Sequence, residues 1–476
     1  MFLINWGELE GRTDVEFYVP SVLKYIERLK GMEHQKLLFI SQKFANGSTP
    51  SEGKFEQTGV LYYRSQDIGL MEMQKKQYIS EEFDEKLSRS RCRTGDVLVA
   101  IVGATLGRIG FIERDEQQGN INQNITKITI SDLRFSPKFV AVFLDSKLGQ
   151  IQLYRLSTKT AQSYLNNEQL GKVIIPTVCK SLQNDIVKAI EEAHQQAEKK
   201  KSKADELLNS INYYMLNALN IALPLKPCGD LANRIFYINA NDMLGGRFDP
   251  RKYSLKYKQL FEAIKSAPYN RMLLKEVVLN DVSGDWGLDD TVEDPDLISC
   301  LTIRGTEFDN KFNLNLDNNR TKFRKYKKAS FSKIELNEKD ILIEKSGGSE
   351  DQPVGRVAFV EKDMLDNYPL AFSNFIHRIR IDDKKAVPEY VFEYLRLMHN
   401  IKITEVMQTQ TNGIRNLIMQ EYFTQTILLP KQKKQEEIAV HVAQMRKHAF
   451  ELQMEAEKIV SDAKGKVEKM LLGDEQ

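Results

Sequence analysis

The chain has 476 residues, more than one hydrophobic core usually serves, so two or more domains are expected. Its 68 Lys and Arg residues nearly balance 66 Asp and Glu residues, so a nucleic-acid interface has to come from local patches and not from an overall basic field. The four cysteines form no C-x-x-C pair, which argues against a structural zinc site and a disulfide framework; with no signal-peptide layout and no apolar run that could span a membrane, this favours a cytoplasmic protein.

Residues 1–178 predict a mixed unit of short strands and helices. An amphipathic helix is expected over 21–30, and a second helix over 137–151. Apolar runs typical of strands occur between them and after them, at 59–64, 95–103, 107–112, 122–130 and 173–176. Pro176 stops the last strand.

The same order of segments returns in residues 223–430. Gly246-Arg247 repeats Gly11-Arg12, and Pro430 repeats Pro176, so the offset between the copies varies from 235 to 254 residues. Strands are expected at 297–304, 338–345, 355–360, 372–381 and 427–430, and helices after 253 and over 388–401. The wandering offset places insertions inside the units, and variable loops on a common frame suit the recognition of two different targets.

Each unit is followed by a long helix, expected over 179–222 and 431–476. Small and apolar residues recur in both helices at the spacing of a heptad. The two patterns are offset by 252 residues, and Gln435 repeats Gln183 at this same offset. The predicted interhelix seam consists of Ile190, Ala197, Ala204, Ile211, Val442, Ala449, Ala456 and Ala463. A narrow, Ala-rich stripe predicts a close pair of helices within one chain, not homodimerisation.

Several of these blocks resemble the DNA-specificity (S) subunits of type I restriction-modification systems. The blocks are Gly95-Asp96-Val97-Leu98 with Gly107-Arg108, Asn122-Gln123-Asn124-Ile125, and the passage from Tyr164-Leu165-Asn166 to Pro176, within the alternation of two units and two helices. One departure stands out, because the second unit has Lys339-Asp340 where the first has Gly95-Asp96.

The resemblance implies an α+β fold in which two target recognition domains, 1–178 and 223–430, are separated by helices 179–222 and 431–476 that form an antiparallel coiled coil. It implies a host-defence protein with no catalysis and no cofactor of its own. Each domain would read one half of a split site in double-stranded DNA. The implied partners are two modification subunits, which use S-adenosylmethionine, and restriction subunits, which hydrolyse ATP with Mg²⁺.

Basic runs and small-residue loops supply the candidate DNA-binding residues. Cations neutralise phosphates whatever the sequence, whereas forked Arg and amide groups match base edges in the major groove. The candidates are Arg64, Lys75, Lys76, Arg89, Arg91, Thr105, Arg108, Gln162, Ser163, Arg304, Lys322, Arg324, Lys325, Lys345, Arg356, Asn412 and Arg415. A solvated loop or edge strand is the competing interpretation for each basic run.

Two other functions remain open from the residues. Pro295-Asp296 followed by Asp309-Asn310-Lys311 superficially matches the acid-acid-lysine pattern of metal-dependent nucleases, although it has no counterpart in the first copy. A protein-binding scaffold that uses the coiled coil alone is the second alternative. A methyltransferase is disfavoured because no Gly-rich cofactor loop and no Pro-Pro motif occur.

Overall fold

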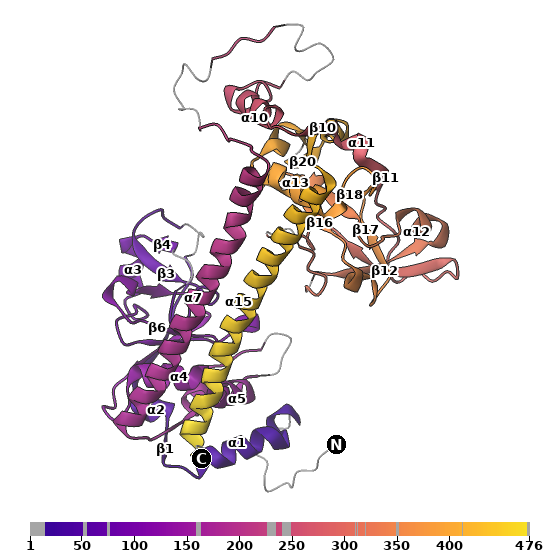
Figure 1. Cartoon of the computed structure of the whole chain (residues 1–476). Coiled ribbons are helices and arrows are strands. Elements are labelled where there is room, and N and C mark those ends of the chain that lie inside the picture. Colours follow the sequence, from indigo (N-terminus) through magenta and orange to yellow (C-terminus); the bar gives the residue numbers. More distant parts are fainter. Residues whose placement is uncertain are drawn as a thin grey trace. The chain divides into compact units, whose positions relative to one another are not determined.

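The computed structural model describes residues 15–50, 55–73, 77–158, 163–225, 235–239, 249–309, 311, 313–318, 320–348, 352–411 and 413–473. Contacts divide the chain into two compact units (Figure 1). Unit 1 comprises Met1–Lys203 with Glu451–Gln476, and unit 2 comprises Ala204–Phe450. Both units combine helices with small sheets, which confirms the α+β class.

Unit 1 contains short strands, short helices and one end of each long helix. Its strands are β1 (His34–Lys36), β2 (Ser41–Asn46), β3 (Val60–Tyr63), β4 (Gln77–Ile79), β5 (Val97–Ala100), β6 (Ile109–Phe111), β7 (Gly119–Ile121), β8 (Ile125–Ile130) and β9 (Ile174–Pro176). Its helices are η2 (Val15–Tyr18), α1 (Pro20–Lys30), α2 (Leu37–Ile40), α3 (Glu81–Lys86), η3 (Gly103–Thr105), η4 (Asp115–Gln117), α4 (Pro137–Asp145), α5 (Lys147–Leu156), α6 (Asn167–Gly171) and the first part of α7 (Lys180–Ala218).

Unit 2 repeats this order with additions. Its strands are β10 (Asn270–Leu273), β11 (Val278–Ser283), β12 (Leu297–Ile303), β13 (Lys322–Lys327), β14 (Ile341–Glu344), β15 (Ser346–Gly347), β16 (Val357–Phe359), β17 (Leu370–Phe372), β18 (Ile376–Ile381), β19 (Gln408–Thr411), β20 (Ile414–Leu417) and β21 (Thr426–Leu429). Its helices are α10 (Leu255–Lys265), α11 (Leu274–Val277), α12 (Lys328–Ile334), η5 (Lys362–Leu365), α13 (Pro388–Asn400), η6 (Ile403–Val406), α14 (Met419–Phe423) and the first part of α15 (Gln432–Leu472).

The sheets of the two units have the same topology. A four-stranded antiparallel sheet has the order β2-β8-β5-β6 in unit 1 and β11-β18-β14-β16 in unit 2. A three-stranded sheet, β4-β3-β7 or β13-β12-β17, pairs one neighbour antiparallel and the other parallel. A two-stranded sheet, β1-β9 or β10-β21, completes each set. The repeat predicted from the sequence is therefore confirmed in these three sheets, and unit 2 adds a three-stranded sheet of order β15-β20-β19.

The four-stranded sheet lies between two cores, which explains why its central strand reads as an unbroken apolar run. In unit 1, Val97 and Val99 of β5 pack in the core that includes helices α4 and α5, while Leu98 and Ala100 pack in a core shared with the three-stranded sheet. In unit 2, Ile341 and Ile343 of β14 face the helical core and Leu342 faces the other. A strand buried on both faces loses the alternation of a half-exposed strand.

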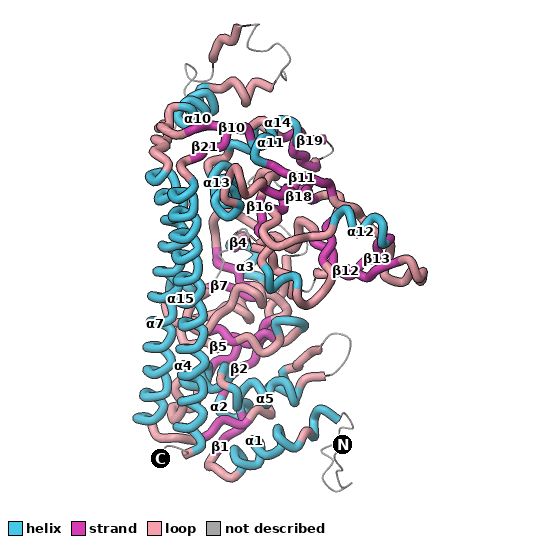
Figure 2. The backbone as a smooth tube through the Cα atoms, turned by 45° about the vertical axis from the view of Figure 1, so that its right-hand side comes forward, coloured by secondary structure: helices cyan, strands magenta, loops and turns pink. Residues whose placement is uncertain are grey.

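The long helices α7 and α15 lie side by side in Figures 1 and 2. Within unit 1, Ile186 and Ile190 of α7 share a core with Val467 and Leu471 of α15, and the Lys200 ammonium bonds the Glu455 carboxylate at 2.5 Å. Within unit 2, Ile211 and Met215 of α7 share a core with Ile438 and Val442 of α15. The beginning of α7 thus meets the end of α15, and the reverse, so the pair is antiparallel.

The seam residues of this pair are buried as their heptad positions predict. Those less than 4% exposed are Ile190, Ala197, Ala204, Ile211, Val442, Ala449 and Ala456. Ala463 is partly buried against the unit 1 core. Alanine at these positions lets two helix backbones approach closely.

The repeated glutamines are buried clamps at the start of each long helix. The Gln183 amide accepts a hydrogen bond from the Ser136 backbone N–H at 2.7 Å and donates to the Val178 carbonyl at 2.9 Å. The Gln435 amide accepts from the Val387 N–H at 3.0 Å and donates to the Pro430 carbonyl at 2.8 Å. Each amide joins the long helix to the N-terminus of an earlier helix of its unit, α4 or α13.

The segment that follows β8 contains two helices, α4 and α5. The single helix predicted over 137–151 is wrong, because the chain leaves helical geometry at Ser146, whose side chain accepts from Gly149 N–H and caps α5.

Lys339 occupies the position equivalent to Gly95, and both residues have a positive φ, of +71° and +91° respectively. Lys339 takes the left-handed conformation that glycine adopts without strain, and its ammonium pairs with Glu389 at 2.8 Å.

Candidate nucleic-acid interface

Four loops meet at one end of the four-stranded sheet in each unit. In unit 1, Ile101 N–H donates to the Asn124 carbonyl at 2.9 Å, and Leu165 N–H donates to the Ile101 carbonyl at 2.9 Å. The Thr49 hydroxyl donates to the Gln123 side chain, which brings the loop after β2 to the same place. We call residues 48–49, 101–108, 122–124 and 163–165 the loop edge of unit 1.

The same backbone bonds define the loop edge of unit 2. Lys345 N–H donates to the Phe375 carbonyl at 2.8 Å, and Leu417 N–H donates to the Lys345 carbonyl at 2.7 Å. The Trp286 ring lies 5.7 Å from the Phe375 ring, at an angle of 62°. The loop edge of unit 2 comprises residues 285–286, 345–348, 355–356, 373–375 and 415–417.

The equivalent backbone bonds align the two loop edges residue by residue, and their side chains differ. The pairs of equivalent residues are Thr49 and Trp286, Ile101 and Lys345, Asn124 and Phe375, and Ser163 and Arg415. Unit 2 has an aromatic ring or a cation at each of these positions, whereas unit 1 has a hydroxyl or amide group at three of them and the buried Ile101 at the fourth. A shared frame with different chemistry at one edge is typical of binding sites that select different targets.

Lys345 lies at the centre of the unit 2 loop edge. Its ammonium donates to the Ser283 hydroxyl at the end of β11. Burial lowers the pKa of the Lys345 ammonium, since a charged group is less stable out of water. Beside it, the Ser346 hydroxyl donates to the Asn416 side chain at 2.7 Å, which joins β15 to β20.

The equivalent arginines Arg108 and Arg356 have different environments. The Arg356 guanidinium is 7% exposed and bonds the buried Glu344 carboxylate at 2.7 and 2.8 Å, with further bonds to the Phe308 and Gly305 carbonyls. It therefore joins internal loops instead of facing solvent. In unit 1, Ala100 occupies the position of Glu344, and Arg108 is half-buried and donates to the Gln66 carbonyl. Of the two, Arg108 is the one whose charge no carboxylate neutralises among the described residues.

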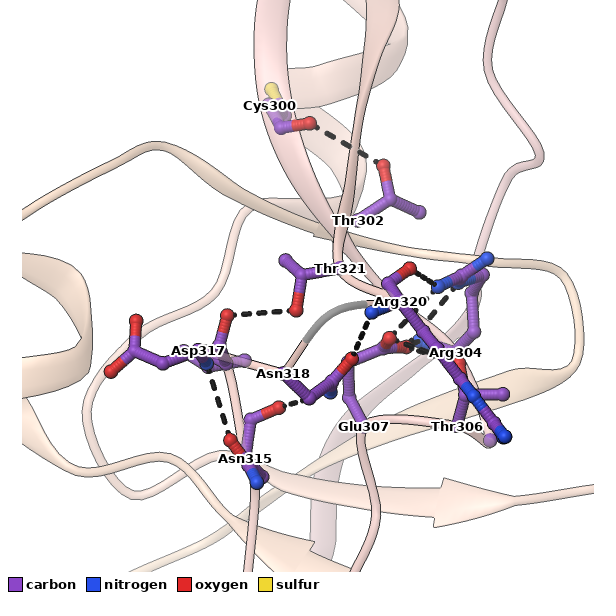
Figure 3. A network of polar contacts seen from close by, with 12 residues as sticks. Cys300, Thr302, Arg304, Thr306, Glu307, Asn315, Asp317, Asn318, Arg320 and Thr321 are labelled. Carbon is purple, nitrogen blue, oxygen red and sulfur yellow. Dashed lines mark hydrogen bonds and ion pairs between the residues drawn. The ribbon is translucent and has the colours of Figure 1, made fainter. Parts of the chain in front are cut away.

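Arg64 and Arg304 close matching turns after β3 and β12. The Arg64 guanidinium bonds Asp67 at 2.8 Å, and Arg304 bonds the fully buried Glu307 at 2.9 Å. Figure 3 shows Arg304 between Glu307 and the backbone carbonyl of Arg320, to which it also donates. These arginines hold the turn, and in unit 2 also the segment before β13, so their first role is to position loops.

Strand β13 carries the basic run of unit 2 at the outside of its sheet. Its neighbour on one side is β12, and Lys325 forms an isolated bridge with Leu288 on the other. Lys322 is exposed and Lys325 half-buried, and neither makes an ion pair in the part of the chain that the structure describes. Arg324 instead donates to the Trp286 carbonyl at 2.6 Å and to the Gly287 carbonyl at 3.2 Å.

The remaining candidates in unit 1 are more dispersed. Arg89 is exposed, whereas Arg91 pairs with the buried Asp84 carboxylate. The Thr105 hydroxyl donates to the Val102 carbonyl at 3.3 Å, and the Ser163 carbonyl accepts from Gly103 N–H at 2.9 Å. Lys75, Lys76, Gln162 and Asn412 lie outside the described residues.

The sequence interpretation missed Trp286, Phe375 and Gln123 as site residues. All three were visible in the sequence, but each looked like an ordinary loop residue. The signal that could have found them is the comparison of equivalent positions, since Thr49 becomes Trp286 and Asn124 becomes Phe375 between otherwise matching frames.

The nuclease pattern has a structural explanation. The Asp309 carboxylate accepts from the backbone N–H groups of Lys311 at 2.7 Å and Asn313 at 2.8 Å, so it organises a turn. Among the described residues, no group of three His, Cys, Asp or Glu side chains is arranged to hold a metal ion. No helix in that same part of the chain is both long and apolar enough to cross a membrane.

Two comparisons with known proteins each match about a third of the chain. Residues 307–458 match the family model of the type I restriction modification DNA specificity domain. The specificity subunit of the type I restriction enzyme EcoBI from Escherichia coli is 30% identical over 156 residues, 32% of this chain and 32% of that protein. The aligned part thus spans about a third of the length of this curated relative.

Solved structures similar to the chain include one from a study of complex assembly and conformational transition in a type I restriction-modification system, with 14% identity, a TM-score of 0.49, and 93% and 98% of the two chains covered. The HsdS subunit from Thermoanaerobacter tengcongensis is 14% identical, with a TM-score of 0.38 and 93% of this chain and 97% of that chain covered. The type I S subunit from M. genitalium is 13% identical, with a TM-score of 0.41 and 92% of this chain and 95% of that chain covered.

Residues 307–458, which include β13, the loop edge of unit 2 except residues 285–286, and the first part of α15, are thus similar to the DNA specificity domain of type I restriction-modification systems.

Proposed function

We propose that the chain is a non-catalytic DNA-specificity subunit that recognises a bipartite site in double-stranded DNA. Unit 1 reads one half of the site through its loop edge, and unit 2 reads the other half. Helices α7 and α15 keep the separation of the two half-sites constant, because a close-packed helix pair of this length is stiff.

One observation carries this proposal: the two loop edges share a backbone frame and differ in chemistry. Thr49 and Asn124 offer hydroxyl and amide groups in unit 1, where Trp286 and Phe375 offer rings in unit 2. A catalytic site would need the same reacting groups wherever it is repeated. Different side chains on one frame support the recognition of two different base sequences.

The partners follow from the family and are part of the proposal. The chain would position modification subunits that carry S-adenosylmethionine and restriction subunits that use ATP and Mg²⁺, and it would bind none of these cofactors itself. Two buried acidic groups pair with arginines, Glu344 with Arg356 and Glu307 with Arg304.

Replacing Lys322 and Lys325 together by alanine should weaken binding to every duplex by a similar factor. The two ammonium groups would release condensed counterions on binding phosphate, so the slope of log K against log salt concentration should become shallower by about 2. The measurement is DNA affinity by fluorescence anisotropy at several salt concentrations. We prefer these lysines to Arg324, whose loss would also release the Trp286 loop.

The matched control is Lys433→Ala with Lys447→Ala, which removes the same charge from exposed positions on α15. An unchanged slope in the β13 variant, or an equal change in both variants, would show that β13 makes no phosphate contact.

A further inference from the structure

We infer that unit 2 contacts the bases of its half-site through the aromatic pair Trp286 and Phe375, while unit 1 contacts its half-site through polar groups at the equivalent positions. This inference rests on the proposed function and adds the residues that distinguish the two half-sites. The main observation behind it is the exposure of two large rings at the loop edge of unit 2.

The two rings face solvent although they are paired with each other. Trp286 is 43% exposed and Phe375 is 41% exposed, although their centroids are only 5.7 Å apart. Ring surface of this kind gains free energy when a flat, apolar partner covers it. In a duplex the base faces are covered by stacking, so exposed rings gain such contact from thymine methyl groups in the major groove or by wedging between base steps.

The aromatic pair is held in place before any ligand binds. Arg324 donates to the Trp286 carbonyl at 2.6 Å, and its guanidinium lies 5.2 Å from the centre of the indole ring. The Phe375 carbonyl accepts from Lys345 N–H at 2.8 Å. Because both rings are already ordered, little conformational entropy is lost when they meet a base.

Charge around the rings selects DNA over an apolar protein surface. The Lys345 backbone N–H donates to the Phe375 carbonyl, the Arg324 side chain donates to the Trp286 carbonyl, and Lys322 and Lys325 lie beside Arg324 on β13. Cations that surround an apolar centre match a polymer whose bases are flat and whose backbone is anionic. The partner of the aromatic pair is therefore a base pair of the half-site, flanked by its own phosphates.

Unit 1 has no ring at either equivalent position. Thr49 and Gln123 are exposed and bonded to each other, and Asn124 is half-buried. Amide groups make directional bonds to base edges, above all to adenine. Substitutions at the aromatic pair should therefore affect one half of the site only.

The test uses the full chain with Trp6→Phe, which leaves Trp286 as the only tryptophan, because the sequence contains two. The probe is the duplex that the chain enriches from a random library. Binding of this duplex should quench the Trp286 fluorescence. In the wild-type background, Trp286→Ala and, separately, Phe375→Ala should lower affinity for the duplex on the order of tenfold or more, leave the salt slope unchanged, and relax base preference in one half-site.

The matched control is Tyr213→Ala, since Tyr213 is an exposed aromatic residue on α7 in the same unit and belongs neither to the loop edge nor to β13. This variant should keep the affinity and base preference of the unaltered chain. The inference is overturned if fluorescence does not respond to the bound duplex, if the Trp286 and Phe375 variants weaken all duplexes equally, or if the Tyr213 variant behaves like them. Those results leave the proposed function standing, whereas a chain that enriches no sequence removes both.

Discussion

Replacing Glu344 by alanine should lower the free energy of unfolding of unit 2 by about 3–5 kcal/mol, because it strands the Arg356 guanidinium without its counter-charge. Glu344 is 2% exposed and Arg356 7% exposed, and two bonds of 2.7 and 2.8 Å join them. The penalty comes from a charge left unpaired in the interior, not from the loss of a favourable contact alone.

Urea denaturation followed by circular dichroism measures this loss. The control is the double variant Glu344→Leu with Arg356→Met, which removes both charges and keeps apolar volume. It should recover most of the stability, since buried ion pairs are often replaceable by well-packed apolar residues. If Glu344→Ala cost under 1 kcal/mol, or the double variant were as unstable as the single one, Arg356 would not depend on Glu344.

Replacing Ala197 by leucine should destabilise the chain by about 1–3 kcal/mol, because three extra carbon atoms would enter a seam that has no room for them. Ala197 is 2% exposed on α7. One helical turn further on, Lys200 bonds Glu455 of α15, so the two helices are in contact at this level. A larger side chain must push α15 away or adopt a strained rotamer.

The matched control for this prediction is Gln195→Leu, which places the same side chain on the exposed face of the same helix. Thermal unfolding should show a lower midpoint for Ala197→Leu and little change for Gln195→Leu. Equal midpoints for the two variants would mean that the alanine seam does not limit the distance between the helices.

The sequence was sufficient to predict the parts of the fold that depend on local periodicity. Heptad spacing predicted α7 and α15 within a few residues, and apolar runs located β5, β14 and their hairpin partners. The repeated order of segments also predicted that the two units are copies of one fold, which no single element could indicate. Gln183 and Gln435 illustrate this gain, because their shared offset pointed to a shared role that the structure explains as a buried clamp.

The parts that could not be predicted depend on partners distant in the sequence. Arg356 and Arg108 look alike in the sequence, and strand pairing sets them apart: β14 with β16 places Glu344 against Arg356, and β5 with β6 places Ala100 against Arg108. The break at Ser146 was missed because the apolar face continues through it, although serine is a good N-cap residue. Trp286 could not be singled out from the sequence because its ring partner, Phe375, lies 89 positions later in the chain.

The central claim is that each unit reads one half of a split DNA site. The most direct measurement is sequencing of the duplexes that the unaltered full-length chain enriches from a random library. The account predicts two short specified elements of different sequence, separated by a spacer of constant length and arbitrary sequence. A single continuous motif, two copies of one element, or no enrichment at all would contradict it.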